Sequence, residues 1–293
     1  MGQVNKYKER YGMPFKVGIG LNLIYIIFEL LFGILFSSVA LMTDAMHNLS
    51  DVFGLIVSWL AGIISFKEKT PKMTYGYKQA TVLGAFANAT FVLAAMVWII
   101  IEAIINFNPQ GSKQGLSVAG IALIGVVINF TTAFLFQKDS QEDLNIKGAF
   151  IHMAADGMIS LGVVFSGLLI SITGWGGIDS LTSILVAIIV IYSSWGLLRQ
   201  SLSLLMAAVP EDMDIDQIIK VVKSFNEITD YHDLHVWGIG TNDVAMSIHI
   251  SLEKQSDYAD VLGRLTSNLK EIDKVTHTVV QVDCPQVENE NDF

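Results

Sequence analysis

Residues 41–51 read Leu41-Met-Thr-Asp44-Ala-Met-His47-Asn-Leu-Ser-Asp51, a polar motif at the start of an apolar run that continues to residue 66. Asp44, His47 and Asp51 follow one another at spacings of three and four, so one face of a helix would carry all three. Ionisable side chains inside a membrane-spanning helix are costly and mark candidate functional positions. The stretch therefore predicts a helix whose polar face points into a bundle.

The whole chain has the composition of a membrane protein. Its 293 residues are 52% hydrophobic and 16% charged, with a mean hydropathy of +0.51, whereas soluble globular domains carry about 25% charged residues. These values exclude a disordered chain and argue against an ordinary soluble enzyme. A spanning helix needs about 20 apolar residues. We predict six such helices, at Val17–Ser37, Leu41–Phe66, Thr81–Phe107, Leu116–Phe136, Gly148–Thr173 and Ile178–Leu198.

Charge divides the chain into two predicted domains. Residues 1–209 hold 12 Lys and Arg against 11 Asp and Glu, and residues 210–293 hold 6 against 17. We therefore predict a six-helix transmembrane domain over residues 1–209 and an acidic cytoplasmic domain over residues 210–293. The acidity argues against nucleic acid as a partner, because binding to phosphates needs basic surfaces. The single cysteine, Cys284, excludes a disulfide framework.

Lysine and arginine predict the orientation in the lipid bilayer. Eleven of them precede the first span, lie between the second and third or the fourth and fifth spans, or follow the sixth, whereas the other three loops hold only Lys113. Positive residues concentrate in cytoplasmic loops, so we expect both termini and the acidic domain in the cytoplasm. The compact length and the lack of extra targeting segments favour a bacterial inner (plasma) membrane.

A second polar pair of the same kind lies in the fifth predicted span, where His152 and Asp156 are four residues apart. Together with His47 and Asp51, this pair would offer two imidazole nitrogens and two carboxylate oxygens. Such a set suits tetrahedral Zn²⁺, with Cd²⁺ or Co²⁺ as competitors. The alternative for one pair alone is a His–Asp hydrogen bond that fixes helix register. Two matching pairs on separate helices favour the metal site.

These residues resemble the cation diffusion facilitator family, in particular its zinc-exporting branch. The resemblance covers nearly the whole chain. Besides the two His-x-x-x-Asp pairs it rests on Tyr75–Asn88 (YGYKQATVLGAFAN), Asn145–Asp156 (NIKGAFIHMAAD) and Tyr231–Trp237 (YHDLHVW). It implies a homodimer that exchanges Zn²⁺ for H⁺, with His47, Asp51, His152 and Asp156 as the transport site. His47 favours zinc, because the manganese and iron members tend to carry Asp at this position.

The acidic part of the chain reads α-β-β-α-β. The predicted elements are a helix at residues 214–225, strands at 231–238 and 243–252, a helix at 257–272 and a strand at 275–283. This order suits a small α+β domain with a ferredoxin-like arrangement of helices over a sheet. A domain of about 75 residues is marginally stable alone, so we expect dimerisation to stabilise it.

The family resemblance implies a second zinc site in this domain, structural or regulatory, at the dimer interface. It places His232, His249 and Asp283 at the matching positions and His277 near them, while surface histidines that bind no metal are the alternative. A regular strand would point His232 and His235 to opposite faces. His277 and Asp283 are six residues apart, about 20 Å along one strand. We therefore expect either two sites or one site that spans the dimer.

The predicted mechanism is alternating access around the membrane His/Asp site. Metal binding requires ionised carboxylates and neutral imidazoles, so loading the site releases protons. No nucleotide-binding or metalloprotease motif occurs in the chain, and we expect a transporter that is not an enzyme. Three alternatives are a zinc-sensing scaffold that transports nothing, a proton-coupled carrier of organic cations, and an intramembrane metal hydrolase. The hydrolase would need an open coordination position on its zinc.

Overall fold

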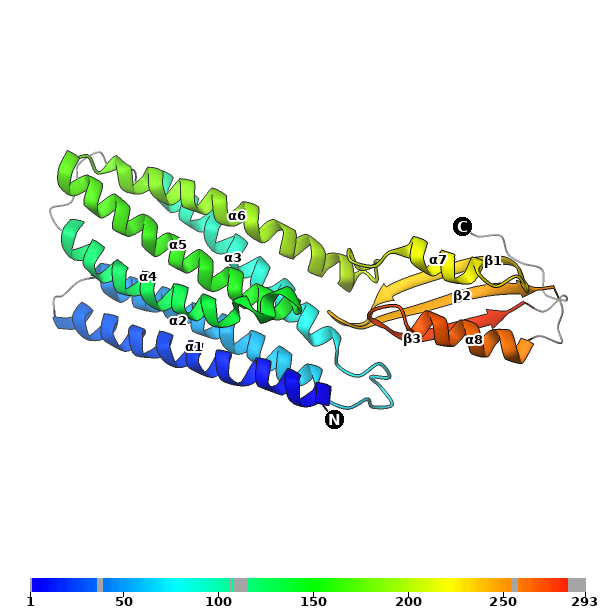
Figure 1. The fold of residues 1–293 in the computed structure, drawn as a ribbon. Helices are drawn as coiled ribbons and strands as arrows, with labels where there is room; N and C mark the ends of the chain where they lie inside the picture. Colours follow the sequence, from blue (N-terminus) through cyan, green and yellow to red (C-terminus); the bar gives the residue numbers. More distant parts are fainter. Residues whose placement is uncertain (1, 36–38, 106, 108–114, 254–257, 284–293) are drawn as a thin grey trace. The chain divides into compact units, whose positions relative to one another are not determined.

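The structure, a computed structural model, describes residues 2–35, 39–105, 107, 115–253 and 258–283. Contacts group the chain into two compact units, residues 1–201 and 202–293. Six long helices come first in the chain. They are α1 (Gly2–Leu35), α2 (Val39–Ser65), α3 (Gln79–Ile105), α4 (Gly115–Gln137), α5 (Leu144–Thr173) and α6 (Gly177–Leu205) (Figure 1).

These helices confirm the predicted membrane bundle. Within the residues that the structure describes, five helices are long and apolar enough to span a bilayer, and α2 contributes the shorter apolar stretch Asp51–Ser65. The largest differences from the predicted spans are at the start of α1 and the end of α6. α1 begins at Gly2, so it includes the polar residues that precede the predicted span. α6 continues past Leu198 to Leu205, and Ala207 then takes a positive φ of 59°.

α5 contacts α2, α3 and α4 and carries one of the two His/Asp pairs. Asp143 is its N-cap and accepts hydrogen bonds from the backbone N–H groups of Asn145 and Ile146, at 2.8 and 3.2 Å. Such a cap satisfies N–H groups that have no partner within the helix. Gly174 ends the helix with a φ of 70°, a left-handed conformation that costs glycine little. The caps thus delimit a helix whose buried face includes His152.

Two of the buried clusters of the bundle include residues of α5. The first joins α1, α2, α4 and α5 through Tyr11, Phe15, Leu55, Ala133, Phe136, Ile146, Ala149 and Met153. The second joins α3, α5 and α6 through Val92, Met96, Ala155, Val186, Ala187 and Val190. α5 contributes to both clusters. Its buried residues therefore pack against α1, α2 and α4 in one cluster and against α3 and α6 in the other.

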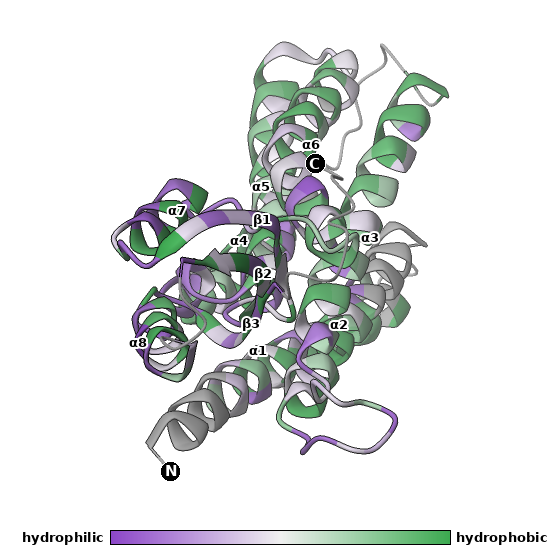
Figure 2. Cartoon of the chain, turned by 90° about the vertical axis from the view of Figure 1, so that its right-hand side faces the viewer, coloured by the Kyte–Doolittle hydropathy of each residue, from purple (hydrophilic) through white to green (hydrophobic). Residues whose placement is uncertain are grey.

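The second unit confirms the predicted αββαβ order. Its elements are α7 (Ile215–Lys223), β1 (Ile228–Gly238), β2 (Val244–Leu252), α8 (Tyr258–Lys270) and β3 (Val275–Val282). β2 is the central strand, antiparallel to β1 and parallel to β3. Met246, Ile248 and Ile250 of β2 are buried in a core shared with α7 and α8. In Figure 2, α7 and α8 carry hydrophilic as well as hydrophobic residues, as amphipathic helices over a sheet do.

Candidate metal centre

α2 and α5 bring together three of the four predicted membrane ligands. The Nε2 atom of His152 lies 3.1 Å from Oδ1 of Asp51 and 3.5 Å from Oδ2 of Asp156. All three residues are buried, and one ligand atom from each lies within 4.8 Å of the others. His47 lies on α2, one helical turn before Asp51. Its side chain and that of Asp44 lie outside the described part of the chain.

The geometry of this membrane cluster suits a tetrahedral ion. Ligand atoms bound at about 2.0–2.1 Å to a tetrahedral Zn²⁺ lie about 3.3 Å from one another. The measured separations of 3.1 and 3.5 Å bracket that value. Two carboxylates beside one imidazole carry an excess of negative charge, which a divalent cation would balance in a buried setting. The cluster can therefore accept such an ion with little rearrangement.

A buried polar pair connects α1 to the same part of α2. Asn48 donates a hydrogen bond of 2.7 Å from Nδ2 to Oε2 of Glu29, and both residues are buried. Asn48 precedes Asp51 by less than one helical turn, so the pair lies close to the predicted ligands along α2. The sequence analysis missed this contact, because nothing in the spacing of Glu29 and Asn48 indicates that they meet.

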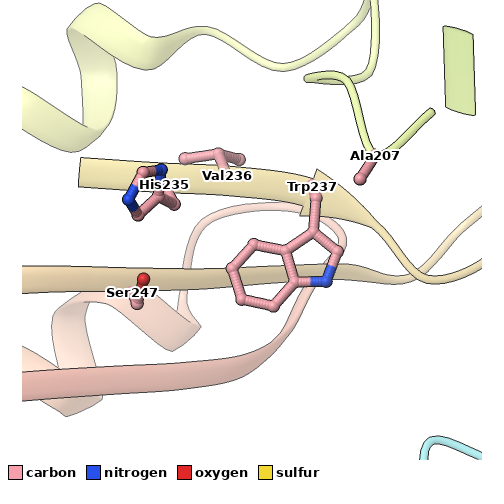
Figure 3. A pocket seen from close by; sticks show the side chains of 5 residues that line it. All are labelled: Ala207, His235, Val236, Trp237 and Ser247. Atoms are coloured by element: carbon pink, nitrogen blue, oxygen red, sulfur yellow. The ribbon is translucent and has the colours of Figure 1, made fainter. Parts of the chain in front are cut away.

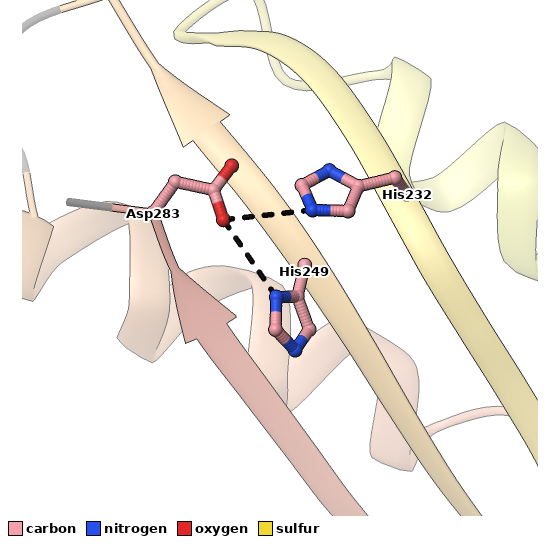
Figure 4. Close-up of side chains that lie close together, drawn as sticks. All are labelled: His232, His249 and Asp283. Atoms are coloured by element: carbon pink, nitrogen blue, oxygen red, sulfur yellow. Dashed lines mark ion pairs between the residues drawn. The ribbon is translucent and has the colours of Figure 1, made fainter. Parts of the chain in front are cut away.

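The three strands of the second unit bring His232, His249 and Asp283 together on the sheet face that points away from α7 and α8 (Figure 4). Oδ1 of Asp283 lies 3.8 Å from Nε2 of His232 and 3.7 Å from Nδ1 of His249. The Asp283 N–H donates to the Ile250 carbonyl at 3.0 Å and so continues the pairing of β3 with β2. Ser251 donates a 2.5 Å hydrogen bond to the second carboxylate oxygen of Asp283.

The prediction that His232 and His235 point to opposite faces is wrong. His232 pairs with His249 and His235 pairs with Ser247, so three steps along β1 match two along β2. This is a β-bulge, which inserts one residue and turns the next side chain back to the first face. Asp233 lies in the bulge with a φ of 51°. Its carboxylate oxygens lie 2.7 Å from Nε2 of His235 and 3.5 Å from Nε2 of His249.

His277 is the predicted cytoplasmic ligand that the structure does not bring into this cluster. It is the register partner of Ala245, whereas Gln281 is the partner of His249. Four residues of β3, about 13 Å of extended chain, therefore separate His277 from the level of the cluster. This agrees with the prediction that His277 and Asp283 are too far apart along one strand to bind the same ion.

A hollow of about 390 Å³ lies on the same unit, lined by Ala207, His235, Val236, Trp237 and Ser247 (Figure 3). Its lining contains one imidazole and no carboxylate. Metal sites in proteins combine several such donors, and the five lining residues offer only one. The donor set of the cytoplasmic unit is concentrated instead at His232, His249 and Asp283.

Two family models match the chain and together cover both units. The "Cation efflux transmembrane domain" matches residues 15–206, and the "Cation efflux protein, cytoplasmic domain" matches residues 210–284. The chain belongs to the cation efflux family. This confirms the family that the paired His-x-x-x-Asp motifs predicted, and it agrees with a helical bundle followed by a small α+β domain.

Named relatives of this cation efflux protein match it over most of their length. The "Cadmium, cobalt and zinc/H(+)-K(+) antiporter" of Bacillus subtilis (strain 168) is 32% identical over 91% of this chain and 87% of its own. The "Cation efflux system protein CzcD" of Alcaligenes sp. (strain CT14) is 28% identical over 95% and 89%. The "Zinc transporter ZitB" of Escherichia coli (strain K12) is 30% identical over 88% and 83%.

Proposed function

We propose that this protein exports Zn²⁺ from the cytoplasm in exchange for protons, and that Cd²⁺ and Co²⁺ are further substrates. The observation that carries the proposal is the buried cluster of Asp51, His152 and Asp156 inside an apolar helical bundle. We assign His47 as the fourth ligand, because it lies one turn before Asp51 on α2. The names of the relatives in Bacillus and Escherichia support zinc and proton exchange.

The exchange follows from the protonation chemistry of the ligands. A carboxylate or imidazole binds a metal ion through a lone pair that protonation removes, so metal and protons compete for the same atoms. Loading at the low proton concentration of the cytoplasm releases protons, and protons from a more acidic exterior displace the metal. The cycle moves an ion without making or breaking covalent bonds in a substrate, so we propose a transporter and not an enzyme.

We propose that residues 1–209 span a bacterial plasma membrane with both termini in the cytoplasm. The asymmetry of lysine and arginine between alternate loops supports this orientation. Cys284, the single cysteine, provides the test. A membrane-impermeant maleimide should label it in inside-out vesicles and leave it unlabelled in intact spheroplasts, and the reverse pattern would contradict the orientation.

We further propose that residues 210–293 form a homodimer contact and bind a second zinc ion. His232, His249 and Asp283 are its ligands by their distances, and Asp233 is a further acid beside His249. His277 belongs to a separate position on the same strand. Three ligands leave one tetrahedral position for water or for a residue of the second copy.

Zinc flux distinguishes this proposal from a sensor and from an organic-cation carrier. The protein is reconstituted into liposomes that contain a trapped zinc indicator, and flux is compared with Asp156→Ala and with Ser194→Ala as a control. Ser194 is also buried, on α6, and its hydroxyl has no hydrogen-bond partner among the described residues. We expect flux in the wild type and the control and its loss in Asp156→Ala. Absence of zinc flux in the wild type would contradict the proposed function.

A further inference from the structure

The two nitrogens of the His152 imidazole have different surroundings. Nε2 faces the carboxylates of Asp51 and Asp156, at 3.1 and 3.5 Å. Nδ1 is buried and has no hydrogen-bond partner among the residues that the structure describes. A buried polar atom without a partner costs free energy, so its position calls for a physical reason.

A nearby amide oxygen is also buried without a hydrogen-bond partner among the described residues. Asn88 of α3 is 1% exposed, and its Oδ1 atom has no donor among the described residues. Its Nδ2 atom donates a 2.6 Å hydrogen bond to Oγ of Ser58. Since the NH₂ group is held by Ser58, the oxygen is directed to the other side of the amide.

Asn88 and His152 both lie beside Gly54 of α2. A Cβ atom placed on Gly54 would lie 3.4 Å from Oδ1 of Asn88 and 3.5 Å from Nδ1 of His152. The two unpartnered atoms therefore border the same small space, which the missing side chain of Gly54 leaves open. One is an acceptor, and the other is the ring nitrogen that does not face the carboxylates.

We propose that Asn88 is a positioning residue that accepts a hydrogen from Nδ1 of His152, directly or through a water molecule beside Gly54. The proposal rests on the metal role of His152 given above. A neutral imidazole that binds an ion through Nε2 keeps its proton on Nδ1. Histidines that bind metal almost always donate this second N–H to a carboxylate, a carbonyl oxygen or water. Asn88 supplies the carbonyl oxygen.

The support for Asn88 continues into α5. Asn145 donates a 2.6 Å hydrogen bond from Nδ2 to the backbone carbonyl of Ser58. The three residues Ser58, Asn88 and Asn145 are buried and come from α2, α3 and α5. The amide of Asn88 is thus held by a network that joins the three helices, and through it the ring of His152 is kept in the tautomer whose Nε2 lone pair faces the carboxylates.

The test compares zinc transport by the full-length protein and its variants in proteoliposomes. Loss of an outer partner of a metal ligand weakens metal binding about 10- to 100-fold. We therefore expect Asn88→Ala to raise the KM for zinc by about that factor, with the maximal rate retained. Asn88→Asp keeps an acceptor oxygen and should restore the KM. The control Ser194→Ala removes another buried polar group of the bundle and should leave the KM unchanged.

A spectroscopic measurement on the wild type makes the test independent of variant folding. In ¹⁵N-histidine NMR with bound zinc, we expect His152 to carry its proton on Nδ1, with the signal assigned by its loss in His152→Gln. Binding of zinc through Nδ1 would overturn the proposal. An unchanged KM for zinc in Asn88→Ala would also overturn it. The same holds if the wild type transports zinc and a folded Asn88→Asp does not restore the wild-type KM. Absence of wild-type zinc flux would instead refute the proposed function, and this inference with it.

Discussion

Replacement of His249 by alanine tests the proposed zinc site of the cytoplasmic domain. His249 lies within 3.7 Å of the shared carboxylate of Asp283. His277 is on the same sheet and is exposed, but it lies four residues along β3 from the register partner of His249. His277→Ala is therefore the matched control. We expect zinc to protect the domain against unfolding in the wild type and in the control, and to lose this effect in His249→Ala.

The magnitude follows from the number of ligands. Zinc at 100 times its dissociation constant stabilises the folded domain by about 2.7 kcal/mol. Removal of an outer partner of a ligand already weakens a metal site about 10- to 100-fold, so loss of one of three direct ligands should cost at least about 100-fold. At the same zinc concentration the stabilisation then falls to about 0.4 kcal/mol. Exchange of backbone amides through unfolding of the domain should slow about 100-fold in the wild type and about twofold in His249→Ala.

Hydrogen exchange by mass spectrometry measures this effect in the full-length protein. Peptides from residues 244–252 report on β2, whose core residues are buried, without interference from the transmembrane helices. Each protein is compared with and without zinc, so that any intrinsic destabilisation by the substitution cancels. Equal zinc protection in His249→Ala and in the wild type would refute the ligand assignment. Loss of protection in His277→Ala would place the ion elsewhere on the sheet.

Two further predictions concern stability. Gly84→Ala would place a Cβ atom in a steric clash with Oδ1 of Asn145, and such overpacking costs about 1–3 kcal/mol. Its unfolding midpoint in detergent should fall, whereas Gly120→Ala, which meets no atom within 4 Å, should unfold like the wild type; equal midpoints would contradict the packing. In the cytoplasmic unit, a hydrogen bond from Arg264 lowers the pKa of Glu227 from its ordinary value. A lowered pKa stabilises the folded state above the unfolded-state pKa, and this contribution is lost as pH falls through the folded-state value. Glu227→Gln should therefore show a weaker loss of stability on acidification, and an identical acid profile would contradict the assignment.

The membrane helices and the shared face of each His/Asp pair could be predicted because they follow from local properties. Length and apolar composition define a spanning helix, and a spacing of four residues places His152 and Asp156 on one face whatever surrounds them. The alternation of apolar residues along the strand likewise predicts that Met246, Ile248 and Ile250 face the core, where they are buried. The spacing of residues within a helix does not predict which helices pack with their polar faces against each other.

Other parts of the sites depend on contacts between distant segments. The bulge at Asp233 arises from the pairing of β1 with β2, and the residues of β1 alone show no signal for it. The shared position of Asn88 and His152 beside Gly54 depends on how closely α3 and α5 approach α2. A glycine within an apolar run signals close packing in general, but it does not identify the side chains that pack there.

We propose that metal and protons exchange at the membrane cluster of Asp51, His152 and Asp156. Zinc flux is measured in proteoliposomes under an imposed pH gradient, which is then reversed, for the wild type, Asp51→Ala and Asp156→Ala. The account predicts that zinc moves opposite to the protons, that its direction reverses with the gradient, and that both variants lose this flux while remaining folded. Zinc flux that ignores the gradient, or that persists undiminished in the two variants, would contradict it.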